Sequence, residues 1–288
     1  MKKFYFLITT ILISLTTYAS NFGSLSYGYA INLAGKQRML SQRITKMTLL
    51  KANHLETNDL NYNLEASISS FTTNYHTLLR NAEKSDKEFV TILKEELKRW
   101  NIFLIEVRKF EGGDMISLLS KSKALLKVCH KFALKLEAEA NFSSEAAYYA
   151  TEDLILQTST VTISNKQRML SQQFGVYYLA GYLYGMEEVF STELKKLRKQ
   201  QSDNLSFLIF NSVNNEIIEE QFMEVTMLFE LLDKYQNMTS DISVLKVISF
   251  CDRITTIFDE ITNNYTKLYE EMKTEKHEDF SSLTSTNK

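Results

Sequence analysis

Hydrophobic residues recur at three- and four-residue spacing along most of this chain, which is the pattern of amphipathic helices. The stretch from 62 to 81 is typical, with apolar residues at Leu64, Ile68, Phe71, Tyr75, Leu78 and Leu79. Polar or glycine-containing breaks divide the pattern into segments of helical length. It predicts helices over residues 25–55, 62–81, 88–110, 114–140, 144–184, 187–213, 215–236 and 240–272.

The composition agrees with this helical pattern. The 288 residues include no proline and only eight glycines, so few residues break a helix. Gly112 and Gly113 fall where the third helix is expected to end, and Asp114 is suited to cap the fourth. We therefore predict an all-α protein of two tandem up-and-down four-helix bundles, over residues 20–140 and 141–272. We expect the polar tail, 273–288, to be disordered.

A short internal repeat is the strongest signal in the sequence. Residues 31–43 read INLAGKQRMLSQR, and residues 161–173 read VTISNKQRMLSQQ. The seven residues from Lys36 to Gln42 recur unchanged as Lys166 to Gln172, 130 positions later. The flanking sequences have diverged, so the identity indicates a constraint specific to this segment. Each predicted bundle thus opens with a first helix that carries the same motif.

The motif could build a small polar pocket. On a helix, Gly35 and Gln42 share one side, and Arg38 lies on the neighbouring stripe. A glycine in mid-helix is about 1 kcal/mol less favourable than alanine, and the usual reason for it is close approach of a helix or ligand. Packing of this helix against its copy would gather donors suited to a compact anion. The alternative is that the arginines and glutamines are solvated surface residues and that Met-Leu is core.

The stretch AGKQRMLSQR resembles the helix-one motif of the PilJ-type domain, the N-terminal sensor domain of type IV pili methyl-accepting chemotaxis transducers. It is also similar to the periplasmic sensor domain of NarX-type nitrate/nitrite histidine kinases. The resemblance implies four-helix bundles that pair side by side, with nitrate bound between the paired first helices in the members that sense it. The ligand-binding residues implied here are Gly35, Arg38, Gln42, Arg43, Arg168 and Gln172.

The resemblance implies a ligand-sensing protein that binds a small anion, with nitrate or nitrite as the first candidate. A planar, always charged guanidinium that donates two parallel hydrogen bonds suits a planar oxyanion. A membrane receptor or sensor kinase is the expected partner. The alternative is a ligand-free helical adaptor that docks on a membrane receptor through the same helix-one surface. We expect no enzyme activity and no cofactor.

The second copy departs from the motif at three positions: Asn165 replaces Gly35, Gln173 replaces Arg43, and Thr162 replaces Asn32. The second copy could therefore be a structural partner, or the site could accept a different ligand. A bundle of four alternating helices starts and ends at the same pole, so a short link near 141–145 would place the first helices side by side. We expect an intramolecular pseudo-dimer, with a homodimer of first repeats as the alternative.

The N-terminus has the pattern of an export signal, with Lys2 and Lys3, an apolar stretch over 4–15, and small Thr17 and Ala19. The apolar stretch is shorter than the roughly 20 residues of a membrane span. We predict a signal peptide over residues 1–19 that is cleaved, and a periplasmic protein; an uncleaved anchor is the alternative. A net charge of −2 without a basic block argues against nucleic-acid binding.

Other potential chemistry in the sequence is sparse. Cys129 and Cys251 fall in apolar helical patterns, which favours buried free thiols over a disulfide. The four histidines show no metal-ligand spacing, and glycine-rich phosphate loops and nucleophile elbows are absent from the sequence. The tyrosines between 177 and 184 could line a cleft, but at helical spacing they more often pack between helices.

Overall fold

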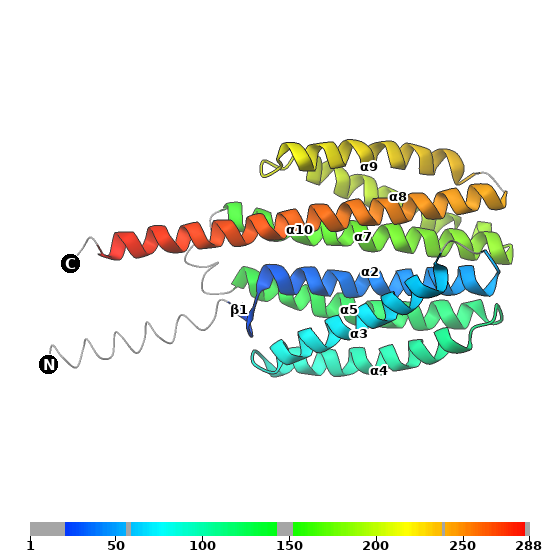
Figure 1. Cartoon of the computed structure of the whole chain (residues 1–288), viewed down its shortest axis with the longest axis horizontal. Coiled ribbons are helices and arrows are strands. Elements are labelled where there is room, and N and C mark those ends of the chain that lie inside the picture. The colour runs from blue at the N-terminus through cyan, green and yellow to red at the C-terminus, as the bar shows by residue number, and fades with distance from the viewer. Residues whose placement is uncertain (1–20, 56–58, 143–151, 238–239, 286–288) are drawn as a thin grey trace.

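The structure is a computed structural model that describes residues 21–55, 59–142, 152–237 and 240–285 (Figure 1). The predicted signal peptide and most of the link between the two halves lie outside these residues. The fold is all-α, as predicted. The helices described are α2 (Tyr27–Ala52), α3 (Leu60–Ala82), α4 (Lys87–Lys109), α5 (Met115–Phe142), α7 (Glu152–Tyr184), α8 (Glu187–Ile209), α9 (Glu216–Tyr235) and α10 (Asp241–Ser285).

Side-chain caps set several of these helix ends. The Asp114 carboxylate accepts a hydrogen bond from the Ser117 backbone N–H at 2.9 Å, as its capping role predicts. The Asn215 side chain likewise accepts from the backbone N–H of Ile218 at the start of α9. Helix α10 differs from the prediction, because it continues to Ser285, where we expected a polar tail after residue 272. A pair of two-residue strands, β1 (Asn21–Phe22) and β2 (Leu25–Ser26), also precedes α2 without a sequence signal.

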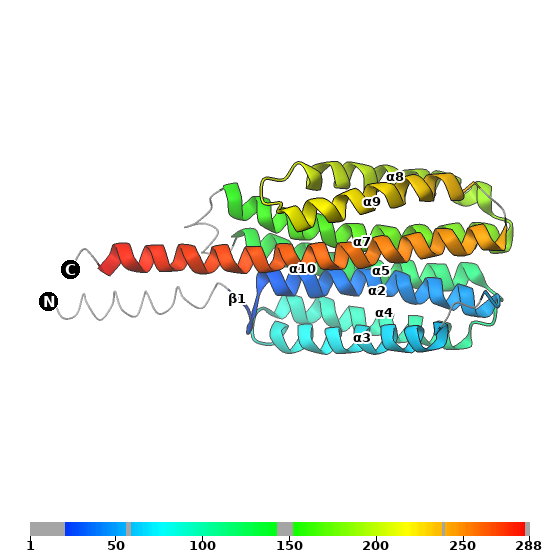
Figure 2. The same ribbon diagram turned by 45° about the horizontal axis from the view of Figure 1, so that its top comes forward.

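The helices form two groups of four that lie side by side. Helices α2, α3, α4 and α5 pack together, and so do α7, α8, α9 and α10. The two groups meet along α2 and α7, which start at the same end of the molecule and run in the same direction (Figures 1 and 2). Helix α5 packs against α2 and α10 against α7, so these two helices flank the contact. The first helices of the two halves are thus adjacent, as expected.

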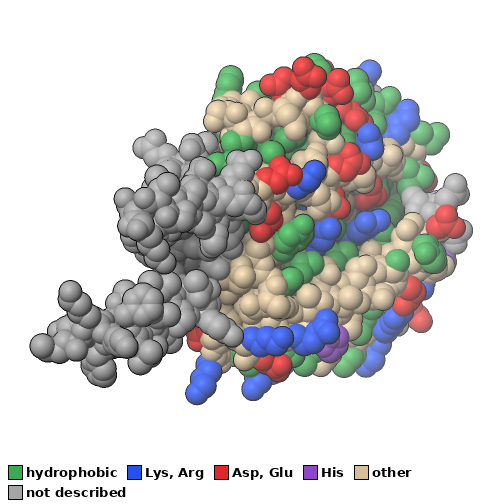
Figure 3. Space-filling view, turned by 60° about the vertical axis from the view of Figure 1, so that its left-hand side comes forward, with side chains coloured by type: hydrophobic (Ala, Val, Ile, Leu, Met, Phe, Trp, Pro, Cys, Tyr) green, Lys and Arg blue, Asp and Glu red, His purple; other side chains and the backbone are tan. Residues whose placement is uncertain are grey.

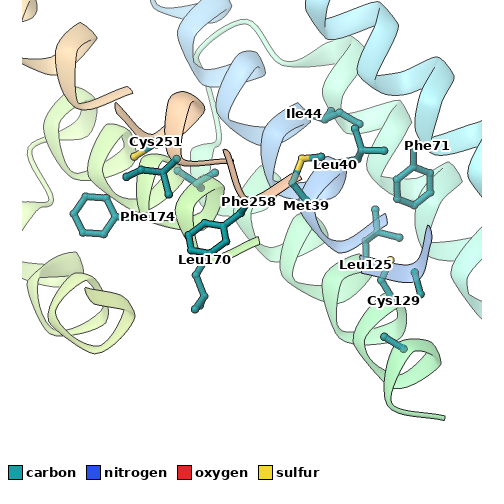
Figure 4. Close-up of a cluster of buried hydrophobic side chains, with 14 of the residues drawn as sticks. Met39, Leu40, Ile44, Phe71, Leu125, Cys129, Leu170, Phe174, Cys251 and Phe258 are labelled. Atoms are coloured by element: carbon teal, nitrogen blue, oxygen red, sulfur yellow. The ribbon is translucent and has the colours of Figure 1, made fainter. Parts of the chain in front are cut away.

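One hydrophobic core runs through both groups. In the first half, Phe71 stacks on Trp100 with ring centroids 4.0 Å apart. Buried hydrophobic side chains of α2 and α5 belong to the same cluster as those of α7 and α10 (Figure 4). Cys129 and Cys251 are part of this core as free, buried thiols, which confirms their prediction. A shared core fixes the relative position of α2 and α7.

Charged side chains of both signs lie on the surface of the molecule. Figure 3 shows Lys and Arg interspersed with Asp and Glu over the described surface, without a large patch of one sign on the face in view. Among the described helices, none combines the length and the apolar character that a membrane crossing requires. The polar residues that the fold buries are therefore the candidates for a functional site.

Candidate functional site at the interface of the two first helices

The two motif copies meet at equivalent positions. We use the term α2–α7 interface for the contact between residues 31–43 of α2 and 161–173 of α7. At its centre, Gly35 faces Asn165, which is its equivalent in the second copy. A Cβ atom added at Gly35 would lie 2.1 Å from Asn165 Oδ1 and 2.3 Å from its Cγ. Close approach of another helix is therefore the reason for this mid-helix glycine, and equivalent positions of the two motif copies meet, as they would around a local two-fold axis.

The polar residues of the motif are buried. Arg38 is 1% exposed and Arg168 is 0% exposed, and the neighbouring glutamines and serines of both copies are equally inaccessible. The interpretation of these side chains as solvated surface residues is therefore wrong. A buried arginine is costly unless its charge and its N–H groups find partners, so the contacts of each arginine determine what the site can do.

The first motif glutamine of each copy points into its own bundle. Gln37 Nε2 donates to Glu96 Oε1 at 3.1 Å, and Gln167 Nε2 donates to the backbone oxygen of Gln201 at 2.7 Å. Glu96 is fully buried, and burial raises the pKa of its carboxyl to about 8. The carboxyl therefore keeps its proton at neutral pH and adds no negative charge to the core.

The second motif glutamine ties each first helix to the fourth helix of its bundle. Gln42 Nε2 donates to Ser122 Oγ of α5 at 3.2 Å. Gln172 Nε2 donates to Asp252 Oδ1 at 2.9 Å and to Thr255 Oγ1 at 2.8 Å, both on α10. These predicted ligand-binding residues therefore have protein partners in the structure.

Both terminal nitrogens of Arg168 have partners within the protein, whereas its buried Nε finds no acceptor among the described residues. Its Nη1 forms an ion pair with Asp259 of α10, and its Nη2 donates to Asn32 Oδ1 of α2 at 2.9 Å. Burial lowers the pKa of Arg168 to about 10, against the opposing effect of Asp259, and the positive charge of Arg38 lowers it further. The last effect indicates that the two motif arginines are electrostatic neighbours across the interface.

Arg38 lacks the corresponding partners. Its Nη1 lies 3.3 Å from His130 Nδ1 of α5, but its Nε and Nη2 are buried and find no hydrogen-bond acceptor among the described residues. The reason lies in the sequence differences between the halves, because Thr162 replaces Asn32 and the neutral ring of His130 takes the place that Asp259 has beside Arg168. Burial lowers the pKa of Arg38, and Glu137 of α5 opposes this effect without forming an ion pair.

Arg43 lies on the side of the interface that faces α10. It is partly buried, and its positive charge helps to lower the pKa of Asp252. Burial would raise the pKa of that carboxyl, but the fully buried Lys46, which pairs with it, has the larger effect together with Gln172 and Arg43. Arg43 Nε is also buried without an acceptor among the described residues, but Arg38 has two such donors, so the unfilled donors that point to a ligand are clearest at Arg38.

Sequence reasoning missed the residues that distinguish the two arginines. The residues that surround the motif arginines and Lys46 lie about 90 residues or more from them in sequence. They are His130 and Glu137 of α5, and Asp252 and Asp259 of α10. The repeated motif is visible in the sequence, whereas its neighbours on the fourth helices become apparent only when the bundles are assembled.

A cavity of about 620 Å³ lies away from this interface, between α7, α8 and α9. Tyr178 and Tyr182 line it together with Arg198, whereas Tyr177 stacks on Phe190 at 5.4 Å, so the tyrosine run both packs and lines a cleft. We give the α2–α7 interface more weight than this cleft, because the interface contains buried donors without partners and the repeated motif. Among the described residues, no group of three or more His, Cys, Asp or Glu is placed to hold a metal ion.

Comparison with known proteins identifies part of the chain. Residues 21–100, which cover β1, β2, α2, α3 and most of α4, match the family described as the N-terminal region of type IV pili methyl-accepting chemotaxis transducers, PilJ. No curated protein and no solved structure matches the chain. The matched segment includes Gly35 and Arg38 of the first motif copy. Residues 21–100 are therefore similar to the N-terminal region of chemotaxis transducers, which supports a role in sensing or signalling for this part of the chain.

Proposed function

We propose that the chain is a non-catalytic sensor that binds one small planar oxyanion at Arg38, in the α2–α7 interface. The observation that carries this proposal is the edge of the guanidinium formed by Nε and Nη2. Both atoms are buried, and neither has an acceptor among the described residues. These two N–H groups point in parallel and match two oxygens of a carboxylate or a nitrate.

Other arginines of this chain use the same edge for oxyanion groups. Arg198 Nε and Nη2 donate to the two carboxylate oxygens of Asp233, both at 2.8 Å. Arg253 Nε and Nη2 donate to the two oxygens of Glu224 at 2.6 and 2.8 Å. Arg38 presents the same pair of donors in a buried position but without the carboxylate. A small oxyanion would complete the arrangement that the protein builds elsewhere from its own side chains.

The electrostatics of the interface favour an anion. Arg38, Arg168 and the fully buried Lys46 place three positive charges within it or beside it, and Asp252 and Asp259 pair with the last two. Glu137 is the acid that acts on the pKa of Arg38, and burial raises the pKa of the Glu137 carboxyl itself. Arg38 thus keeps a positive charge that its surroundings only partly balance, and an anion would supply the missing countercharge.

Nitrate and nitrite are the first candidates because of their size and their shape. The interface is closely packed, and the PilJ-type and NarX-type resemblance points to these ions. With four heavy atoms and a ceiling near 1.5 kcal/mol per atom, nitrate binding is limited to about 6 kcal/mol, a dissociation constant of tens of micromolar. That range suits a sensor of millimolar or submillimolar anion.

Binding at this position would report to the rest of the molecule. Arg38 belongs to α2, and its charge acts on Arg168 of α7, so an anion there would change the balance of charge across the line at which the two four-helix groups meet. A ligand shifts a conformational equilibrium by its difference in affinity for the two states, and here the packing of α2 against α7 is what would differ. We propose that the chain consists of two tandem PilJ-type units and is exported to the periplasm. A membrane partner there would respond to the change in the packing of α2 against α7.

The adaptor alternative finds less support. It requires a free helix-one surface, yet Tyr29 and Lys51 are the exposed residues of α2. The remaining residues of the helix are covered by α3, α5, α7 and α10. Docking through the motif would require separation of the two halves and exposure of buried arginines.

The test is a thermal-unfolding series with sodium nitrate, nitrite, formate and chloride at equal ionic strength. We expect nitrate or nitrite, and not chloride, to raise the melting temperature, because a ligand that binds only the folded state adds about 2.7 kcal/mol at a hundredfold excess over its dissociation constant. Arg38→Lys keeps the charge but loses the parallel donors, so its nitrate response should disappear. Arg80→Lys on the exposed face of α3 is the matched control and should respond like the native chain.

Two results would contradict the proposal. One is the absence of a response to any of the oxyanions in the native chain. The other is an unchanged nitrate response in both Arg38→Lys and Arg38→Met. In either case the motif serves to join the two halves, and the sensing function must use another part of the molecule, with the cleft between α7, α8 and α9 as the next place to examine.

A further inference from the structure

Asn165 occupies a position in the α2–α7 interface that its equivalent, Gly35, leaves open. Its side chain is fully buried and sits directly on the backbone of Gly35, where an added Cβ would be 2.1 Å from Oδ1, 2.3 Å from Cγ and 2.8 Å from Cβ. All three atoms belong to the planar end of the asparagine side chain or to the carbon that carries it. The contact therefore joins a flat group on α7 to a bare stretch of helix on α2.

The carboxamide is held by its shape and only weakly by hydrogen bonds. Its Nδ2 donates to the backbone oxygen of Ile31 at 3.4 Å, which is long for such a bond. Its Oδ1 is buried and finds no donor among the described residues. A buried amide that leaves its oxygen unsatisfied is unfavourable, so hydrogen bonding does not explain why an asparagine is at this position.

The shape of the group suggests another reason. Cβ, Cγ, Oδ1 and Nδ2 of an asparagine lie in one plane around a trigonal centre, as do the four atoms of nitrate. Asn165 lies one helical turn before Arg168, and its neighbour Gly35 lies one turn before Arg38. The two arginines sense each other electrostatically, because the charge of Arg38 lowers the pKa of Arg168. The amide thus fills a flat space next to two buried cations.

We propose that Asn165 is the residue that limits the interface to a single small oxyanion, because its carboxamide occupies a second trigonal-oxyanion position beside Gly35. This inference rests on the function proposed above and concerns the specificity of the same site. With glycine at both equivalent positions, the interface would be symmetric and open on its axis. With asparagine in one copy, the Asn165 carboxamide occupies the space beside Gly35, and only the donors of Arg38 remain for a ligand.

The experiment compares the native full chain with Asn165→Gly and Asn165→Asp in thermal-unfolding series with sodium nitrate against sodium chloride. Asn165→Gly should melt at a lower temperature than the native chain without nitrate and should show a larger nitrate-induced rise. Asn101→Gly, at an exposed position of α4, is the matched control for placing glycine in a helix, and its nitrate response should equal that of the native chain. Asn165→Asp carries a built-in carboxylate of the same shape, so it should lose the nitrate response and melt above the native chain.

Each outcome bears on the inference. A nitrate response of Asn165→Gly that does not exceed the native response overturns it, whatever the native chain does. A response in Asn165→Gly together with none in the native chain supports it, and contradicts instead the proposed function of the native site. If Asn165→Gly does not fold, Asn165→Asp decides, because an Asp variant that keeps the native nitrate response and melts below the native chain overturns the role assigned to Asn165.

Discussion

The two motif arginines have the same local sequence and opposite surroundings. Arg168 is paired with Asp259 and donates to Asn32, whereas Arg38 meets only the ring of His130 and keeps Nε and Nη2 without acceptors among the described residues. The difference shows that an identical heptapeptide does not make identical sites. The residues that complete each site come from the other helix of the pair and from the fourth helix of each bundle, where the two halves have diverged.

The largest expected effect comes from removal of the acid that pairs with Arg168. Asp259→Asn would leave a fully buried guanidinium without its countercharge, and we expect a loss of about 3 kcal/mol in the free energy of unfolding. This is the low end for a buried ion pair, because the Asp259 side chain is 37% exposed. His130→Asn beside Arg38 should lose less than about 1 kcal/mol, since it removes one weak contact.

Urea unfolding measures the free energy of unfolding of both variants, provided that its slope against urea concentration is the same as in the native chain. Glu224→Gln, which breaks the exposed pair with Arg253, is the control and should change stability by less than about 1 kcal/mol. Equal losses for Asp259→Asn and His130→Asn would show that the two arginines are balanced alike, and the contrast between them would then be wrong.

The second prediction concerns the buried groups that receive the first motif glutamines. Gln37 donates to the Glu96 carboxyl, while Gln167 donates to the backbone oxygen of Gln201, so Glu96→Gln would replace the titratable acceptor with a neutral one like that of the second half. Because the pKa of Glu96 in the folded state is about 8, above its value in the unfolded chain, the folded state binds an extra proton between those two values. The stability that this proton contributes is complete at acidic pH and is lost as the pH rises toward 8.

The native chain should therefore lose about 2–3 kcal/mol more than Glu96→Gln between pH 6 and pH 8. Parallel urea titrations of the two proteins at several pH values measure this difference. Cys129 is close to Glu96, and burial raises the pKa of its thiol well above the usual value, so the thiol stays neutral over this range. Identical pH profiles for the two proteins would show that Glu96 does not hold a proton in the folded state.

The smallest predicted effect tests the contact between Gly35 and Asn165 at the centre of the interface. Gly35→Ala should lose about 1–2 kcal/mol, because crowding against Asn165 outweighs the better helix propensity of alanine. Gly113→Ala has open space around it and should be nearly neutral. The double variant Gly35→Ala/Asn165→Gly should recover most of the loss, since the crowding partner is absent. Additive effects in this cycle would contradict the direct contact between the two positions.

The sequence predicted the helices well and the site only in part. Apolar spacing, the Asp114 cap and the lack of proline are local signals, and they placed most helix ends within a few residues of their observed positions. The repeat also predicted the adjacency of the two first helices, and Gly35 indicated a close approach. The continuation of α10 to Ser285 was missed, because its last segment is polar and has no apolar stripe to extend the pattern.

The roles of the individual arginines could not be predicted. Whether the N–H donors of a buried guanidinium have acceptors depends on side chains that lie far away in sequence. Examples are Asp259 for Arg168 and His130 for Arg38. Sequence reasoning recognised that Thr162 and Asn165 break the symmetry of the repeat. It did not separate Arg38 from Arg43, however, because only the packing of four helices shows that the unfilled donors are clearest at Arg38.

The central claim is that the Nε/Nη2 edge of Arg38 is open to an anion, while the same edge of Arg168 is partly occupied because its Nη2 already donates to Asn32. The most direct measurement is a nitrate titration of 15N-arginine-labelled protein followed by the side-chain Nε–Hε resonances, assigned with Arg38→Lys and Arg168→Lys. We predict that the Arg38 resonance shifts progressively and saturates, while that of Arg168 stays nearly unchanged, and that chloride at equal ionic strength moves neither. A saturable shift at Arg168 alone, or no saturable shift at Arg38, would contradict the account.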